Sequence, residues 1–334
     1  MRLKPIAQQV VVVCGASSGI GREAALRFAE RGAQVVVAAR TASALESLVD
    51  EIRERGGSAV AQVADVAVFE QVQLVAERAI SAFGRLDTWV HLAGVGLFAT
   101  FEQLTMEEFQ QVININLMGQ VHGAKAALPY LKRDGGALIH ISSMGAKRAI
   151  PLQTAYCASK HGIQGFVEAM RVEFQHDRVP ISVTNIMPAT LNTPFFDKAR
   201  TKLGVKPVAP PPIYDPRIVV DAIIYAAEHP VRDLIVGGAA MGVIRTQTLS
   251  PRLLDAILRW VGYELHNTHV PKPENVPNSL FAPVEGWATV RGSFGEQTVA
   301  RSMYTWLEIH PAVKRAVGGT LFGALALATM RKKR

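Results

Sequence analysis

The sequence contains very little cysteine, and the two cysteines that are present cannot build a disulfide framework. Cys14 ends a run of four valines, and Cys157 follows a tyrosine among small residues. Disulfide-rich scaffolds need several paired cysteines in an oxidising compartment. That class of protein is therefore excluded. The sequence predicts a reduced setting, in the cytoplasm or at the cytoplasmic face of a membrane.

The chain also lacks metal-ligand patterns and a recognisable leader segment. Its 9 histidines show no spacing typical of zinc sites, and we predict no metal. His140 and His161 lie near candidate catalytic segments, but we interpret them as structural. The N-terminal apolar run passes directly into glycines, so no signal peptide is expected.

Acidic residues are scarce mainly at the C-terminal end. Residues 1–200 carry 20 Lys and Arg against 18 Asp and Glu, whereas residues 201–334 carry 16 against 10. Six of the eight net positive charges come from residues 314–334, which hold six basic side chains and no acid. A nucleic-acid-binding domain needs a basic face with groups that read bases. We therefore expect no nucleic-acid partner.

Short β-branched runs alternate with longer amphipathic stretches over the first 240 residues, as in parallel strands joined by crossover helices. The expected strands are 10–14, 34–39, 58–63, 87–92, 136–142, 181–187 and 233–237, and expected helices include 19–31, 43–55, 68–83, 107–131 and 154–177. The strands are apolar almost throughout, which indicates that both sheet faces are covered. The sequence thus predicts an α/β, doubly wound Rossmann fold with a seven-stranded parallel sheet over residues 1–245. A mainly helical C-terminal extension, 246–334, follows.

The first predicted strand runs into a glycine-rich turn, GASSGIG, and a helix follows at once. Glycines spaced GxxxGxG let backbone amides approach a pyrophosphate at the positive end of that helix. A lone glycine triplet is weak evidence, but its place in a strand–turn–helix predicts a nucleotide site. The residues assigned to the cofactor here are Gly15, Ser17, Ser18, Gly19, Ile20 and Gly21.

The second predicted strand ends at Arg40 rather than at an acidic residue. A carboxylate at this place would bind the ribose 2′-hydroxyl of NAD, whereas an arginine accommodates the 2′-phosphate of NADP. Arg40 therefore predicts NADP(H) as the cofactor.

The segment AYCASK, residues 155–160, places Tyr156 and Lys160 four residues apart. Residues at this spacing are neighbours on a helix, and an adjacent cation favours the phenolate and lowers the pKa of a tyrosine. We interpret the pair as a general acid/base and the cation that tunes it. Taken on its own, the spacing favours a solvated surface pair, and the acid/base interpretation rests on the other motifs.

Together these motifs resemble the short-chain dehydrogenase/reductase family over roughly residues 8–240. The resemblance is carried by GASSGIG, Asp65-Val66, HLAG (91–94), NINLMG (114–119), ISSMG (141–145), YCASK (156–160) and PATLNT (188–193). It implies a catalytic tetrad of Asn116, Ser143, Tyr156 and Lys160. It also implies cofactor contacts at Asp65, Val66, Ala93, Gly94, Tyr156, Lys160, Pro188 and Thr193.

The resemblance assigns a role to each member of the tetrad. Ser143, which precedes Tyr156 by 13 residues and is preferred to Ser142 for that reason, donates to a substrate carbonyl. Tyr156 passes the proton, and Lys160 binds the nicotinamide ribose. Asn116 is implied to hold a water that links Lys160 to solvent.

The sequence departs from the family pattern at two turns. His91 and Leu92 stand where the family has paired asparagines, and Leu92 cannot reproduce an amide contact. Ala189 replaces the glycine that usually follows Pro188, which limits backbone freedom there. We expect weaker cofactor binding, or compensation by neighbours, and no effect on the tetrad.

Residues 190–215 are expected to form a lid over the substrate. This segment contains Phe195, Phe196, Leu203 and Tyr214 with no clustered acids, which favours an apolar ligand over a sugar or a phosphate ester. The alternative is that these side chains only pack the lid onto the domain.

The chain ends in an apolar segment, 316–330, with basic residues on both sides. Its length of about 22 Å is short of the ~30 Å hydrocarbon core of a bilayer. The flanking cations can bind anionic headgroups, so we expect peripheral membrane contact. The alternative is a helix buried in an oligomer interface, where the Gly319–Gly323 pair would permit close packing.

The sequence thus predicts an NADP(H)-dependent oxidoreductase that interconverts a carbonyl and an alcohol on a lipophilic substrate. We also expect a homo-oligomer. One alternative is a polyol or sugar dehydrogenase of the same fold. Another is a catalytically silent nucleotide-sensing protein, which the intact tetrad argues against.

Overall fold

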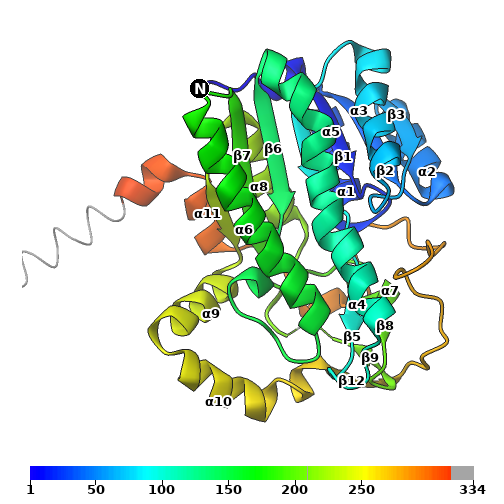
Figure 1. Cartoon of the computed structure of the whole chain (residues 1–334), viewed down its shortest axis with the longest axis vertical. Coiled ribbons are helices and arrows are strands. Elements are labelled where there is room, and N and C mark those ends of the chain that lie inside the picture. The colour runs from blue at the N-terminus through cyan, green and yellow to red at the C-terminus, as the bar shows by residue number, and fades with distance from the viewer. Residues whose placement is uncertain (209, 317–334) are drawn as a thin grey trace, which may run out of the picture.

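The computed structural model describes residues 1–208 and 210–316, and the seven expected strands form one parallel sheet (Figure 1). The strands are β1 (Val10–Cys14), β2 (Gln34–Ala39), β3 (Ser58–Val63), β4 (Thr88–His91), β6 (Gly136–Ile141), β7 (Ile181–Pro188) and β11 (Asp233–Val236). They lie in the order β3-β2-β1-β4-β6-β7-β11, and every neighbouring pair is parallel. The predicted doubly wound fold is confirmed.

Helices cover both faces of the sheet, which explains why β1 and β7 are buried along their whole length. One core lies between the sheet and the helices α1 (Gly19–Glu30), α2 (Ala42–Glu54) and α8 (Arg217–Glu228). The second core lies against α3 (Phe69–Phe83), α5 (Gly119–Asp134) and α6 (Thr154–His176). An apolar strand face on each side therefore meets an apolar helix face, as the continuous hydrophobic strands predict.

The helix expected over 107–131 is interrupted. The structure has α4 (Met106–Ile113), a π-helical turn at Asn114–Met118 and then α5. The backbone amide of Gly119 donates to the carbonyl of Asn114, five residues back. Apolar periodicity continues through the insertion, so a single helix was the natural prediction. Turns of this kind are often found at functional sites.

The strand order reverses between β1 and β4, and this reversal positions the site. β1 has β2 on one side and β4 on the other, and the loops that follow all three strands emerge at the same edge. In open α/β sheets, ligands bind at the carboxyl ends of the strands at such a point.

The C-terminal extension contains helices α9 (Gly238–Leu249), α10 (Pro251–Val261) and α11 (Met303–Glu308). Its strands β12 (Asn267–Pro271) and β13 (Thr298–Val299) pair with β9 (Val205–Pro207) and β10 (Ile213–Tyr214). A third small sheet joins β5 (Leu97–Phe98) to β8 (Arg200–Thr201), which follows the short helix α7 (Phe195–Lys198). The expected lid is therefore held by strand pairing to the extension and to the main domain.

Between β12 and β13 the chain runs along the surface of the main domain (orange in Figure 1). We call residues 279–289 the strap. Ser279 and Thr289 hydrogen-bond to Arg40 and to Gly19. The strap therefore crosses the edge of the sheet where the site is expected.

The C-terminal tail beyond residue 316, with its apolar segment, its glycine pair and its basic end, lies outside the described residues. Among the helices in the described ranges, none has both the length and the apolar character needed to cross a bilayer.

Candidate active site

A cleft of about 260 Å³ lies at the carboxyl ends of the central strands. It brings together all the residues that were predicted to contact the cofactor. They are Gly15, Ser17, Ser18, Gly19, Ile20, Gly21, Arg40, Asp65, Val66, Ala93, Gly94, Tyr156, Lys160, Pro188 and Thr193. Ser143 also borders the cleft, whereas Asn116 lies behind its wall.

Two glycines of the loop after β1 are required by close packing. A Cβ atom on Gly15 would lie 2.5 Å from the backbone nitrogen of Ala93, and one on Gly21 would lie 2.1 Å from the Gly15 carbonyl oxygen. Gly15 also has φ +91°, a conformation that favours glycine. The loop after β1 can therefore lie directly against the turn after β4, and it leaves a narrow cradle at the start of α1 that fits a pyrophosphate.

The strap supplies backbone acceptors to the groups expected to meet cofactor phosphates. The amide of Gly19 donates to the Thr289 carbonyl at 2.8 Å, and Arg40 Nη2 donates to the Ser279 carbonyl at 2.6 Å. The nearest carboxylate to Arg40 is that of Asp65, at 4.0 Å. The Gly19 amide and the Arg40 guanidinium border the cleft, and their partners are neutral carbonyls and a carboxylate 4.0 Å away. Both donors therefore suit phosphate groups, and the residues present fit a nicotinamide dinucleotide.

Ser143 and Tyr156, the residues expected to carry the proton chemistry, both border the cleft. Ser143 follows β6, and its hydroxyl accepts from the Gly145 amide at 3.0 Å. The other serine considered, Ser142, instead donates to the Lys160 carbonyl at 3.3 Å. This geometry supports the choice of Ser143.

The pKa of Tyr156 differs in direction from the prediction. Burial raises it to about 12, and a hydrogen bond with Ser143 lowers it only in part. Lys160 was expected to lower this pKa, but its ammonium lies 5.5 Å from the centre of the Tyr156 ring and donates to the Ile141 carbonyl at 2.9 Å. Desolvation outweighs the cation because the phenol is enclosed. Tyr156 is therefore a protonated phenol at neutral pH, which suits a proton donor.

Lys160 is itself changed by its surroundings. Burial lowers its pKa to about 8, because a charged ammonium is costly to enclose. Its proton is therefore held more weakly than that of an exposed lysine.

We expect a pH dependence from this lysine. With saturating NADPH, kcat/KM for carbonyl reduction should be constant below pH 8 and should fall above it, because Lys160 then loses the charge that orients the cofactor ribose. Lys160→Arg should remove this fall, since arginine stays charged. A pH–rate profile of both proteins tests this, and an identical fall in the variant would contradict it.

Asn116 lies in the π-helical turn and is fully buried. Its Oδ1 accepts from the Val95 amide at 2.8 Å, and its Nδ2 donates to the Val95 carbonyl at 3.0 Å and to Ser159 Oγ at 3.3 Å. The side chain thereby joins the loop after β4 to α6, the helix that carries Tyr156 and Lys160. The water link from Asn116 to Lys160 stays a prediction.

The histidines near the site lie in structural surroundings. His140 is fully buried, its Nδ1 lies 2.7 Å from Gln120 Oε1, and burial lowers its pKa to about 3. His161 Nδ1 lies 2.9 Å from the Cys157 carbonyl. Within residues 1–208 and 210–316, no three His, Cys, Asp or Glu side chains converge as they would around a metal.

The two departures from the family pattern are accommodated by packing. The Leu92 amide donates to the Cys14 carbonyl at 2.8 Å, and the Leu92 side chain packs against the core. The carbonyl of His91 accepts from Gln120 Nε2 at 3.2 Å. The Ala189 amide donates to the Val236 carbonyl at 2.7 Å, so this turn is joined to the edge strand.

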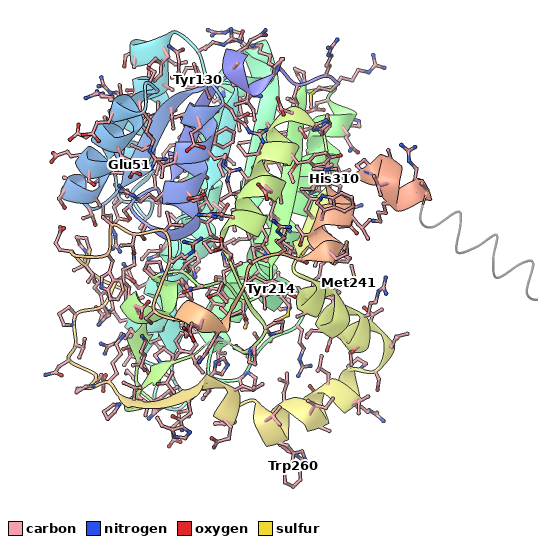
Figure 2. The ribbon with its side chains drawn as sticks, turned by 180° about the vertical axis from the view of Figure 1, so that it is seen from behind. Glu51, Tyr130, Tyr214, Met241, Trp260 and His310 are labelled. Carbon is pink, nitrogen blue, oxygen red and sulfur yellow. The ribbon has the colours of Figure 1, made fainter. Side chains whose placement is uncertain are left out.

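Aromatic side chains from α7 form the substrate side of the cleft. The rings of Phe195 and Tyr156 are 5.7 Å apart, and the rings of Phe195 and Phe196 are 5.3 Å apart. Both phenylalanines border the cleft. Leu203 and Tyr214 do not, which corrects the prediction for these two. Tyr214 is buried beside Gly237, because β10 turns it into the core (Figure 2).

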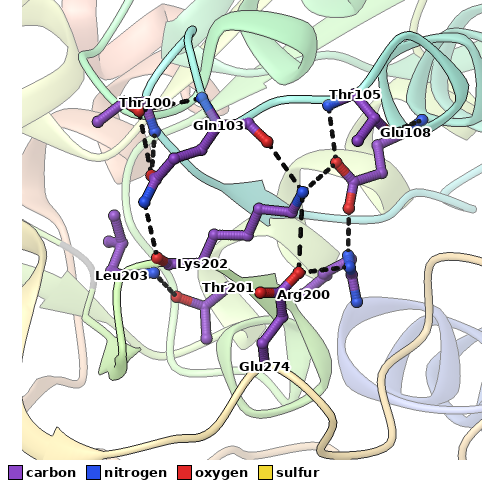
Figure 3. A network of polar contacts seen from close by, with 9 residues as sticks. All are labelled: Thr100, Gln103, Thr105, Glu108, Arg200, Thr201, Lys202, Leu203 and Glu274. Atoms are coloured by element: carbon purple, nitrogen blue, oxygen red, sulfur yellow. Dashed lines mark hydrogen bonds and ion pairs between the residues drawn. The ribbon is translucent and has the colours of Figure 1, made fainter.

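A charged network holds the lid against α4 (Figure 3). Glu108 accepts from Arg200 Nε at 2.6 Å and lies 2.9 Å from Lys202 Nζ, while Glu274 accepts from Arg200 Nη2 at 2.8 Å. Burial raises the pKa of Glu108, but hydrogen bonds from Thr105, Lys202 and Arg200 outweigh it and lower the pKa to about 2. The lid is therefore held by a carboxylate that stays charged at neutral pH.

Sequence reasoning missed three parts of this cleft. Lys198, Gln153 and the strap residues Ser279, Pro283 and Val284 also border it. Lys198 lies two residues after the predicted lid residue Phe196, and its charge was a usable signal. The strap has no periodic pattern and could not have been placed from the sequence.

Comparisons with known proteins agree with this geometry. The family model described as short chain dehydrogenase matches residues 9–204. The uncharacterized oxidoreductase YxnA of Bacillus subtilis is 37% identical over 339 residues, covering 100% of this chain and 94% of that protein. The 11-beta-hydroxysteroid dehydrogenase A of Sesamum indicum is 35% identical over 190 residues, covering 56% of this chain and 54% of that protein.

Two solved structures share the fold. An alcohol dehydrogenase from the archaeon Thermococcus sibiricus, complexed with 5-hydroxy-NADP, has a TM-score of 0.60 at 27% identity and covers 68% of this chain and 95% of its own. A short-chain type dehydrogenase/reductase from Mycobacterium marinum has a TM-score of 0.62 at 26% identity and covers 70% of this chain and 96% of its own. About a third of this chain therefore has no counterpart in either match.

Proposed function

The chain belongs to the short-chain dehydrogenase/reductase family, and from that premise we propose that it is an NADP(H)-dependent oxidoreductase that interconverts a carbonyl and an alcohol on a lipophilic substrate. The observation that carries this proposal is the convergence of Ser143, Tyr156 and Lys160 at one end of a cleft that has Arg40 at the other. The apolar substrate side, with Phe195 and Phe196, supports a lipophilic substrate.

The proposed mechanism assigns one step to each side chain. The bound nicotinamide supplies the hydride in reduction and accepts it in oxidation. Ser143 donates a hydrogen bond to the carbonyl oxygen and holds it beside Tyr156. Tyr156 Oη gives its proton to that oxygen as the alcohol forms, and in the reverse direction it takes the proton back. Lys160 binds the nicotinamide ribose and is held in place by the Ile141 carbonyl.

The alternatives are weaker. A polyol or sugar would need hydrogen-bonding side chains on the lid side, where the cleft has two phenylalanines. A nucleotide-sensing protein without catalysis would have no need of a half-buried tyrosine beside a buried lysine. Purified protein should be screened for turnover of ketones and alcohols with NADPH and NADP⁺. The absence of turnover with every lipophilic carbonyl would reject the enzyme proposal.

We also propose peripheral contact with an anionic membrane. Exposed apolar side chains lie at the end of α9 and along α10, with Leu249 85% exposed, Leu253 54% exposed and Trp260 77% exposed. Trp260 projects away from the body of the protein (Figure 2). Arg252 and Arg259 are exposed on α10 beside it, and cations next to exposed apolar groups suit anionic headgroups.

Vesicle flotation tests this contact. The full chain should float with vesicles containing anionic lipid, and a version ending at Arg315 should bind less while it keeps its turnover of soluble substrates. Adding Leu253→Ser and Trp260→Ser to that version should abolish flotation.

We also propose a homo-oligomer. If the full chain does not bind vesicles, and the version ending at Arg315 has a different oligomeric mass in solution, the tail packs between copies of the chain instead.

A further inference from the structure

Lys198, at the end of α7, reaches from the lid into the cofactor end of the cleft. Its Nζ donates to Ser18 Oγ at 2.7 Å, and Ser18 belongs to the glycine-rich loop. Lys198 also borders a second cavity of about 240 Å³, which adjoins the cleft and is closed on its outer side by the strap. One ammonium group therefore faces both spaces.

Lys198 has no anionic partner at hand. In the part of the chain that the structure describes, no carboxylate lies within ion-pair distance of its Nζ. The neighbouring Asp197 is held by Lys206 at 2.5 Å and by the Ser293 hydroxyl at 2.7 Å. Burial and the nearby charge of Arg40 lower the pKa of Lys198 to about 8, and Asp197 opposes them only in part. The ammonium is thus enclosed beside another cation.

The guanidinium of Arg40 is also incompletely paired. One of its guanidinium nitrogens, Nη1, is buried and has no hydrogen-bond partner among the described residues. Asp65 is 4.0 Å away, and the Ser279 carbonyl is neutral. Two half-buried cations that repel each other are costly, and an anion between them would satisfy both.

The surroundings fit a phosphate group. The hydroxyl-bearing residues Ser17 and Thr41 border both the second cavity and the cleft, as Lys198 does, whereas Arg40 borders the cleft alone. A phosphate that meets both cations therefore lies where the two spaces join, beneath strap residues 284–288. The Ser43 hydroxyl donates to Glu285 at 2.7 Å. Glu285 is exposed, so its charge is screened by solvent and opposes an anion only weakly.

We propose that Lys198 is a specificity-determining residue, whose ammonium binds the 2′-phosphate of NADP(H) together with the Arg40 guanidinium beneath the strap. This inference rests on the proposed function, since it concerns the cofactor of that reaction. It adds a cation that arrives from the substrate lid rather than from the nucleotide-binding loops. Lid position and cofactor selection are thereby coupled through one side chain.

Calorimetric binding of NADPH, NADH, 2′-AMP and 5′-AMP to the full chain tests the proposal without turnover. Lys198→Ala should weaken NADPH and 2′-AMP by roughly 10- to 100-fold, because a charge-assisted hydrogen bond to phosphate is lost. NADH and 5′-AMP should change by less than about threefold, since they lack the 2′-phosphate. Lys198→Arg should retain most of the affinity for NADPH, and Lys125→Ala, on the exposed face of α5, is the control.

The following results would overturn the proposal. If Lys198→Ala weakens NADPH and NADH equally, Lys198 binds the part that both cofactors share and the proposal is wrong. Unchanged binding of 2′-AMP would also overturn it. If the wild-type protein binds NADH as well as NADPH, the NADP preference in the proposed function fails as well. A melting curve of Lys198→Ala without ligand, matching that of the wild type, shows that the variant is folded.

Discussion

Tyr156→Phe should lower kcat for carbonyl reduction by roughly 10²- to 10⁴-fold, the range that general acid catalysis supplies. The variant removes the hydroxyl that Ser143 positions and that gives its proton to the substrate oxygen. The ring remains, so its contact with Phe195 at 5.7 Å is kept. NADPH binding should therefore change little.

Steady-state kinetics and NADPH titration of the variant measure the two expectations separately. Tyr130→Phe, on α5 away from the cleft, is the matched control and should keep the wild-type rate (Figure 2). A near-normal kcat in Tyr156→Phe would show that Tyr156 is not the proton donor. A variant that loses both binding and turnover would indicate misfolding, and its melting curve would show this directly.

Arg40→Asp should reverse the cofactor preference, with NADPH binding weakened by about 100-fold and NADH binding maintained or improved. The aspartate repels the 2′-phosphate and can accept a hydrogen bond from a free 2′-hydroxyl. It also removes the repulsion between the Arg40 charge and the Lys198 ammonium. The variant should therefore remain folded.

The ratio of kcat/KM values with NADPH and NADH tests this expectation. Arg78→Asp, on the exposed face of α3, makes the same charge change far from the cleft and should leave the ratio unaltered. An unchanged ratio in Arg40→Asp would show that the 2′-phosphate binds elsewhere.

The sequence predicted the sheet and the cradle because their causes are local. β-branched runs such as Val10–Cys14 favour an extended strand by their own side chains, and their continuous apolar pattern indicates that both faces are covered. The requirement for Gly21 is also local, because a Cβ atom there would meet the Gly15 carbonyl within the same loop, whereas Gly15 must approach Ala93, 78 residues further along the chain. Arg40, Tyr156 and Lys160 then follow from their positions on these elements.

Other features of the site depend on which residues pack around a side chain in the folded protein. This packing cannot be read from the sequence. The pKa of Tyr156 was predicted to fall beside Lys160, but burial decides it and raises it. The π-helical turn that buries Asn116 interrupts a segment whose apolar pattern is continuous. Lys198 gains its importance only because the lid brings it beside Arg40.

The strap also sets the order in which the cleft is completed while the chain is made. Arg40 and Ser279 are separated by 239 residues. At a synthesis rate of about 5–20 residues per second, the wall that Ser279 provides reaches the ribosome's exit roughly 12–48 seconds after Arg40 does. The sheet edge that carries the glycine loop is translated long before the segment that covers it. In a nascent chain, the glycine-rich loop is therefore made first, and the strap can cover it only later.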